Sequence, residues 1–210
     1  SSHCGPSASA AGSSAIPPGA MSQPTSMLFT VGHSNHQAPA FFALLQKYRV
    51  FELVDVRSIA SSGRYPQFKK QELERLCKAH GVAYWHCPEL GNKVGGICHL
   101  LRRAEGQWGL QELLVRARGG CGGDGGSPAP GRGSDDWAAR HRWAAFMCAE
   151  ADWTDCHRQV IAQVLTDDYG VTVRHIRRDG SCEEHPRGHQ LPDRYHAQLR
   201  GPPPTDEEIA

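Results

Sequence analysis

Short apolar runs alternate with amphipathic segments along the chain from residue 27 onwards. The apolar runs are rich in β-branched and aromatic residues, which predicts β-strands at 27–31, 51–57, 82–88, 142–148 and 171–176. The segments between them place apolar residues at helical spacing, which predicts helices at 38–48, 68–81, 110–118 and 156–168. In the first of these segments, one helical face carries Phe41, Leu44, Leu45 and Tyr48.

Strands that alternate with helices predict an α/β fold, with a mainly parallel sheet and helices on both of its faces. In such sheets the ligand site lies beyond the carboxyl ends of the strands. Polar residues gather at these positions, namely His33, Ser34, Asn35, Asp55, Arg57, His86, Glu89, Cys148 and Glu150. We therefore expect a functional site at this edge of the sheet.

The 210 residues predict a single folded domain over 27–200. Residues 1–26 consist largely of Ser, Ala, Gly and Pro, which predicts a disordered segment. The absence of acidic residues before Glu52 is compatible with an organelle-targeting segment, but such segments are usually Arg-rich and the first basic residue here is Lys47. A Gly-rich stretch at 119–134 predicts a flexible loop, and 201–210 reads as a disordered acidic tail.

The charge balance excludes several kinds of partner surface. With 23 basic and 22 acidic residues, the net charge of +1 favours neither a nucleic-acid coat nor a membrane surface. No apolar run approaches the ~20 residues of a membrane span, so we predict no membrane partner. Eight cysteines without the regular spacing of a small secreted domain favour free thiols in a reducing compartment, either the cytoplasm or a reducing organelle lumen.

The stretch FMCAEADWTDCHRQVIAQVL, residues 146–165, carries the most reactive chemistry. Thr154 or Asp155 is placed to cap a helix, with Cys156 in its first turn. Unpaired N–H groups and the helix dipole would lower the pKa of a thiol there, and Arg158 would assist. Cys156 is therefore a candidate catalytic thiolate. The alternative is a half-buried cysteine that packs under the loop.

A metal site is the second interpretation of the same stretch. Cys148 and Cys156 could bind a metal with His157 or His33, or could form a disulfide or redox pair. Adjacent residues on a helix point ~100° apart, however, so one metal should not reach both Cys156 and His157. The spacing also matches none of the usual zinc patterns. We therefore predict no metal ligands, and the sequence leaves the cofactor unknown.

The other strand ends offer acid–base and anion-binding groups. His33 suits proton transfer, whereas Ser34 and Asn35 suit either ligand binding or the turn after the strand. Asp55 and Arg57 alternate on one strand face, which predicts an ion pair. A second possibility is that Arg57 and Arg158, joined by Arg64, hold a phosphate-like anion against the helix start.

Several short motifs together carry a family resemblance. The chain contains TVGHSN at 30–35, LVDVRS at 53–58, PQF at 66–68, PELG at 88–91 and MCAE with CHR between 147 and 158. This combination resembles the domain of unknown function family 488. The resemblance implies a Rossmann-like three-layer α/β fold and no settled activity. Residues 97–135 depart from the family pattern, either as an insertion or through a gene-model error.

Three functions follow as hypotheses. The first is an enzyme for a small phosphorylated or nucleotide-like anion, with catalytic groups from Cys156, Cys148, Glu150 and His33 and ligand contacts from Ser34, Asn35, Asp55, Arg57, Arg64, His157 and Arg158. The second is rhodanese-like sulfur transfer, although Arg158 lies ten positions after Cys148 rather than within a short loop. The third is a non-catalytic nucleotide or nucleic-acid module that uses Arg57, Arg64 and the basic patch at 174–178.

Overall fold

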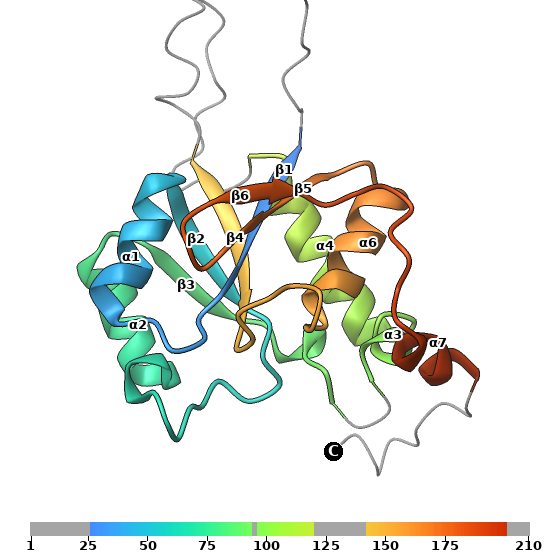
Figure 1. Ribbon diagram of the computed structural model, residues 1–210, viewed down its shortest axis with the longest axis horizontal. Helices are drawn as coiled ribbons and strands as arrows, with labels where there is room; N and C mark the ends of the chain where they lie inside the picture. Colours follow the sequence, from blue (N-terminus) through green and yellow to red (C-terminus); the bar gives the residue numbers. More distant parts are fainter. Residues whose placement is uncertain (1–25, 94–95, 120–141, 201–210) are drawn as a thin grey trace, which may run out of the picture.

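The structure is a computed structural model that describes residues 26–93, 96–119 and 142–200 (Figure 1). The side chains of 197–200 lie outside this description. The predicted disorder of 1–25 and 201–210, and the flexible loop over 120–134, also fall outside the described residues.

Six strands form one sheet, in which β1 and β4 are central neighbours. The order is β3-β2-β4-β1-β5-β6, and the bounds are β1 Met27–Gly32, β2 Val50–Asp55, β3 Ala83–His86, β4 Trp143–Cys148, β5 Thr172–Ile176 and β6 Cys182–Glu184. Every neighbouring pair is parallel except β5 and β6, so the predicted α/β fold with a mainly parallel sheet is confirmed.

The helices follow the predicted alternation, with additions near the carboxyl edge of the sheet. They are α1 Ala38–Lys47, α2 Lys70–Ala79, α3 Ile97–Leu100, α4 Ala104–Ala117, α6 Arg158–Asp167 and α7 Asp193–Arg200, with short 3₁₀ turns η1 Pro66–Phe68 and η2 Pro88–Leu90. The sequence pattern did not predict α3, α7 or β6. None of the helices in the described ranges has the length and apolar character of a membrane span.

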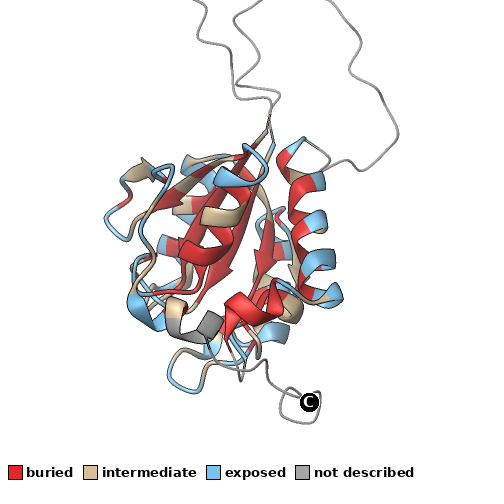
Figure 2. Cartoon of the chain, turned by 90° about the vertical axis from the view of Figure 1, so that its right-hand side faces the viewer, coloured by how far each residue is buried: buried red, intermediate tan, exposed pale blue. Residues whose placement is uncertain are grey.

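Two groups of buried side chains hold the helices against the sheet. Phe41 of α1 and Leu73 of α2 pack with Phe29 of β1 in one group, whereas Leu110 of α4 and Ile161 of α6 pack with strand residues in the other. Figure 1 accordingly has α1 and α2 on one side of the strands and α4 and α6 on the other. Buried residues line the strands and the inner helix faces in Figure 2, while the outer helix faces are exposed.

The chain leaves the two central strands in opposite directions. From β1 it runs through α1 to β2, whereas from β4 it runs through α6 to β5. The two loops still touch at their start, where the backbone N–H of His33 donates to the carbonyl of Cys148 at 2.9 Å.

Gly32 makes this close approach possible. A Cβ atom at this position would lie 1.8 Å from the carbonyl oxygen of Glu150 and 3.0 Å from Nη2 of Arg158. Any larger residue would therefore push the loop that follows β4 away from the end of β1. Gly32 of the TVGHSN motif thus allows Glu150 and Arg158 to lie close to the end of β1.

Candidate functional site

A cavity of about 390 Å³ lies over the carboxyl ends of β2 and β4. Cys148, Glu150, Cys156 and His157 contribute from the loop that follows β4. The remaining wall comes from the loop after β2, from the segment after η2 and from α7, through Arg57, Ser58, Ile59, Ser61, Asn92, Arg194 and Tyr195. This volume suits a small-molecule ligand.

Two thiols, a carboxylate and an imidazole converge at this cavity. The Sγ atoms of Cys148 and Cys156 lie 2.8 and 3.1 Å from Oε2 of Glu150. The same sulfur atoms lie 3.5 and 3.7 Å from Nδ1 of His157. One ligand atom from each of the four residues lies within 4.8 Å of the others.

The sequence argument that Cys156 and His157 point apart is wrong. It placed Cys156 inside a helix capped by Thr154 or Asp155, but α6 begins at Arg158 and has no side-chain cap. The hydroxyl of Thr154 instead donates to Oδ1 of Asp152 at 3.0 Å. Cys156 and His157 therefore lie in the turn before the regular helix, where their side chains rotate toward one point.

The pKa values of the two thiols are shifted in opposite directions. A hydrogen bond to Cys156 and burial hold the pKa of Cys148 well above its usual value. Burial alone would raise the pKa of Cys156, but hydrogen bonds from Cys148 and His157 and the charge of Arg158 hold it well below. Burial opposes the charged form of His157 as well, but the contact with Cys156 raises its pKa. Cys156 is thus the thiolate of the pair.

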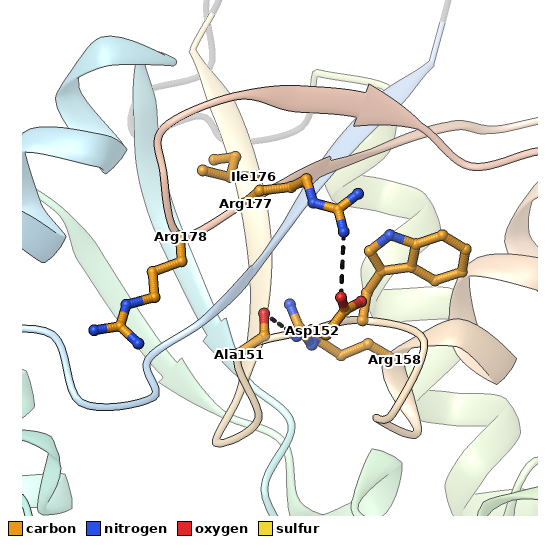
Figure 3. Close-up of a pocket in the computed structure, with 7 residues that line it drawn as sticks. Ala151, Asp152, Arg158, Ile176, Arg177 and Arg178 are labelled. Carbon is orange, nitrogen blue, oxygen red and sulfur yellow. Dashed lines mark hydrogen bonds and ion pairs between the residues drawn. The ribbon is translucent and has the colours of Figure 1, made fainter.

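Arg158 lies beneath the cluster rather than in the cavity, with 1% of its surface exposed. Its Nη2 donates to the carbonyl of Glu150 at 2.8 Å, and its Nε lies 3.3 Å from Sγ of Cys156. It lines a separate cavity of about 100 Å³ with Asp152 and Arg177, which pair with each other at 3.2 Å (Figure 3). The hypothesis that Arg57 and Arg158 clamp one anion is therefore not supported by this arrangement.

Asp55 and Arg57 form the predicted ion pair, and it is buried. Nε and Nη2 of Arg57 donate to the two carboxylate oxygens at 2.8 and 2.6 Å. Nη1 of Arg57 lies 3.2 Å from Nε2 of His33, whose Nδ1 lies 3.0 Å from the carbonyl of Ser34. Burial lowers the pKa of His33 to about 4, so the ring is neutral and accepts from the guanidinium. His33 supports Arg57 from behind the cavity wall.

The DUF488 match

The residues of this cluster lie within a region shared with a known protein family. A family model described as "Domain of unknown function DUF488" matches residues 37–96 and 135–165. The matching family is DUF488. The DUF488 match includes Asp55, Arg57, Cys148, Glu150 and the Cys156–Arg158 segment. It leaves out 97–134, where the sequence departs from the family pattern, and no curated protein or solved structure matches the chain.

Three predicted ligand-binding residues lie away from the cavity. Ser34 is half-buried with a positive φ of 42°, and its hydroxyl lies 3.5 Å from Oδ1 of the exposed Asn35. Arg64 is exposed in the loop before η1. None of the three is among the residues that line the cavity. The turn interpretation explains Ser34 and Asn35 better than ligand binding does.

Sequence reasoning missed the cavity wall that α7 and the loop after β2 provide. Arg194 and Tyr195 come from α7, and Ile59 stands at the opening with 76% of its surface exposed. Asn92 follows the PELG motif, and its Oδ1 accepts from the backbone N–H of Ile97 at 3.0 Å. Asn92 directly follows PELG, the motif at the end of the third predicted strand, so its position in the sequence could have identified it as a site residue. The α7 residues carried none, because a short polar helix has no distinctive pattern.

A chain of buried hydrogen bonds leads from the cluster through the molecule. Nη1 of Arg158 donates to the hydroxyl of Thr30 at 3.4 Å, and that hydroxyl lies 2.8 Å from Nδ1 of His175. Nε2 of His175 lies 2.9 Å from Nδ1 of His185. The ring of Trp153 stacks on His175 with centroids 4.1 Å apart. Burial lowers the pKa of His175 to about 2 and that of His185 to about 4, so both rings are neutral.

We expect these histidines to make the protein less stable in mild acid. The unfolded chain takes up a proton on His175 near pH 6.5, whereas the folded chain does so only near pH 2, so stability falls as the pH drops below 6.5. His175 should contribute a loss of about 1–2 kcal/mol between pH 6.5 and pH 5. Urea unfolding across this range would measure it.

The variant His175→Phe keeps a ring against Trp153 but cannot titrate, so its stability should fall less steeply with pH. The exposed His80 offers the matched control, and His80→Gln should retain the wild-type slope. An unchanged slope in His175→Phe would contradict the assignment.

Proposed function

We propose that the protein is an enzyme that acts on a small polar or anionic molecule bound in the 390 Å³ cavity. The observation that carries the proposal is the carboxylate of Glu150 beside both thiols, at the cavity over the carboxyl ends of β2 and β4. Clustered reactive groups at the carboxyl ends of parallel strands are typical of active sites in α/β folds.

Glu150 is the group best placed for acid–base chemistry. Glu150 is exposed, whereas its carboxylate lies beside the buried side chains of Cys148, Cys156 and His157. We propose that it removes a proton from a water molecule beside Cys148 and Cys156, which attacks the substrate, and later returns that proton to the leaving group. Arg57, Arg194 and the hydroxyls of Ser58 and Ser61 line the cavity and supply donors for an anionic substituent, such as a phosphate.

Glu150→Gln should lower the turnover of a responsive substrate by about 100-fold or more, because general acid–base catalysis contributes on that order. A panel of phosphate esters, nucleotides, small esters and amides would provide the substrate. The exposed Glu184 on β6 lies outside the cavity, so Glu184→Gln should keep wild-type activity. Full activity in Glu150→Gln would exclude this role.

The two other hypotheses have less structural support. Rhodanese-like transfer calls for a reactive cysteine directly after the strand, whereas the pKa of Cys148 is raised and the thiolate is Cys156. In the basic patch at 174–178, Arg177 is paired with Asp152 and Glu183, and His175 is buried. Arg177 therefore offers little free positive charge to a nucleic acid, whereas Arg178 of the same patch is exposed. Persulfide formation with thiosulfate would support sulfur transfer, and salt-sensitive DNA binding would support a nucleic-acid-binding module.

A further inference from the structure

We infer that Cys148, Cys156 and His157 bind one divalent ion of the zinc type, with Glu150 beside its open position. This inference deepens the proposed function, because it supplies a metal to the same active site. The three side chains are buried, with 4%, 1% and 6% of their surfaces exposed. Their ligand atoms, together with Oε2 of Glu150, lie within 4.8 Å of one another.

The separations between the ligand atoms fit a tetrahedral ion. With Zn–S bonds of about 2.3 Å and Zn–N bonds of about 2.0–2.1 Å, a sulfur and a nitrogen on one ion lie about 3.5 Å apart. Nδ1 of His157 lies 3.5 Å from Sγ of Cys148 and 3.7 Å from Sγ of Cys156. Both distances therefore match the separation of two ligands on one ion, so the ion could bind without a backbone movement.

The orientation of His157 is a second, independent observation. Its Nε2 lies 3.2 Å from the carbonyl of Val56, and a carbonyl can only accept. A metal-bound ring is neutral, so Nε2 would carry its proton and the lone pair of Nδ1 would face the two sulfur atoms. Metal-bound histidines commonly donate their second nitrogen to a backbone carbonyl in this way.

The charges around the cluster also favour a thiolate-bound cation. Both sulfur atoms bind a metal as thiolates, so the two balance the charge of a divalent ion. The backbone N–H and Nε of Arg158 lie 3.5 and 3.3 Å from Sγ of Cys156, where they stabilise the sulfur as a ligand. Sulfur and imidazole ligands select zinc-like ions over magnesium or calcium.

Glu150 is better suited to a base than to a ligand. Its Oε2 lies 2.8 and 3.1 Å from the sulfur atoms, which are hydrogen-bond lengths rather than the wider separation of two ligands on one ion. Catalytic zinc sites keep three protein ligands and one open position for water. In this arrangement the ion would supply the acidity of a water molecule in the open position, and the carboxylate of Glu150 would accept the proton of that water.

The test is metal binding by the full chain, reduced with a phosphine and free of chelator. Co²⁺ should give the sulfur-to-metal absorption and the visible bands of a tetrahedral thiolate site, with a single ion per chain, and Zn²⁺ should displace it. Cys148→Ser, Cys156→Ser and His157→Ala each remove a direct ligand, so each should weaken Zn²⁺ binding by more than the roughly 10–100-fold that loss of an outer-shell partner costs. Cys182→Ser is the matched control, because this half-buried thiol lies outside the cluster, and it should bind as wild type.

Zn²⁺ protection of the wild-type thiols avoids the risk that a variant fails to fold. Mass spectrometry after alkylation should find Cys148 and Cys156 protected by Zn²⁺, with Cys182 unaffected. Absence of the cobalt bands, or equal alkylation with and without Zn²⁺, would overturn the inference. Glu150→Gln separates the two proposals: bound metal with lost activity supports both, whereas bound metal with full activity removes only the role of Glu150.

Discussion

Asp55→Ala should lower the free energy of unfolding by about 3–5 kcal/mol, the usual cost of removing one partner from a buried ion pair. The side chains of Asp55 and Arg57 are 0% and 5% exposed, so water cannot replace the lost carboxylate. The hydroxyl of Tyr84 also donates to this carboxylate at 2.8 Å and would lose its acceptor. Urea unfolding followed by circular dichroism at neutral pH would measure the loss.

The pair of Glu72 and Arg75 is the matched control for this change. It has the same two-bond geometry, at 3.0 and 2.7 Å, but lies exposed on α2. Glu72→Ala should therefore change stability only marginally, since solvent screens such a pair. A comparable loss in the two variants would show that burial does not set the strength of the Asp55–Arg57 pair. The double variant Asp55→Ala/Arg57→Met should regain part of the loss, because it leaves no unpaired buried charge.

Arg158→Met should lower the free energy of unfolding by about 3 kcal/mol. The guanidinium is fully buried, and its loss removes the donor to the carbonyl of Glu150 and the cation beside Cys156. Lysine should not restore stability, because one ammonium group cannot reach Thr30, Glu150 and Cys156 from a single position. Urea unfolding of Arg158→Met and Arg158→Lys would test both statements.

Arg178→Met is the control for the arginine prediction. Arg178 is exposed at the edge of the small cavity that also contains Arg158, and its side chain points away from Asp152 (Figure 3). Its removal should leave stability nearly unchanged. Wild-type stability in Arg158→Lys would mean that the positive charge alone, and not the fork of donors, holds the loop after β4.

Some elements escaped the sequence pattern for identifiable reasons. The start of α4 was predicted at 110, yet the helix begins at Ala104. Glycines lower helix propensity there, but a Cβ at Gly109 would lie 2.7 Å from Cγ of Leu90. Close packing against η2 therefore explains that glycine. The sequence pattern does not predict β6 because this strand is short and charged, and its pairing with β5 follows from a hairpin that turns at Gly180.

The sequence by itself determined the α/β alternation, the mainly parallel sheet and the polar residues that follow each strand. These features are local, since side-chain periodicity and strand composition depend on near neighbours in the chain. It also placed Asp55 and Arg57 on one strand face, which was enough to predict their ion pair.

Only the tertiary structure decided which of these polar residues meet. Strand order places β4 beside β1, and no local pattern encodes that order. The convergence of Cys148, Cys156 and His157 depends on side-chain rotation in a turn, and the burial of Arg158 depends on the loop that Gly32 lets approach. Helix α7 completes the cavity from the far end of the domain. Contacts between distant segments fix these positions, so the site forms only when the whole sheet does.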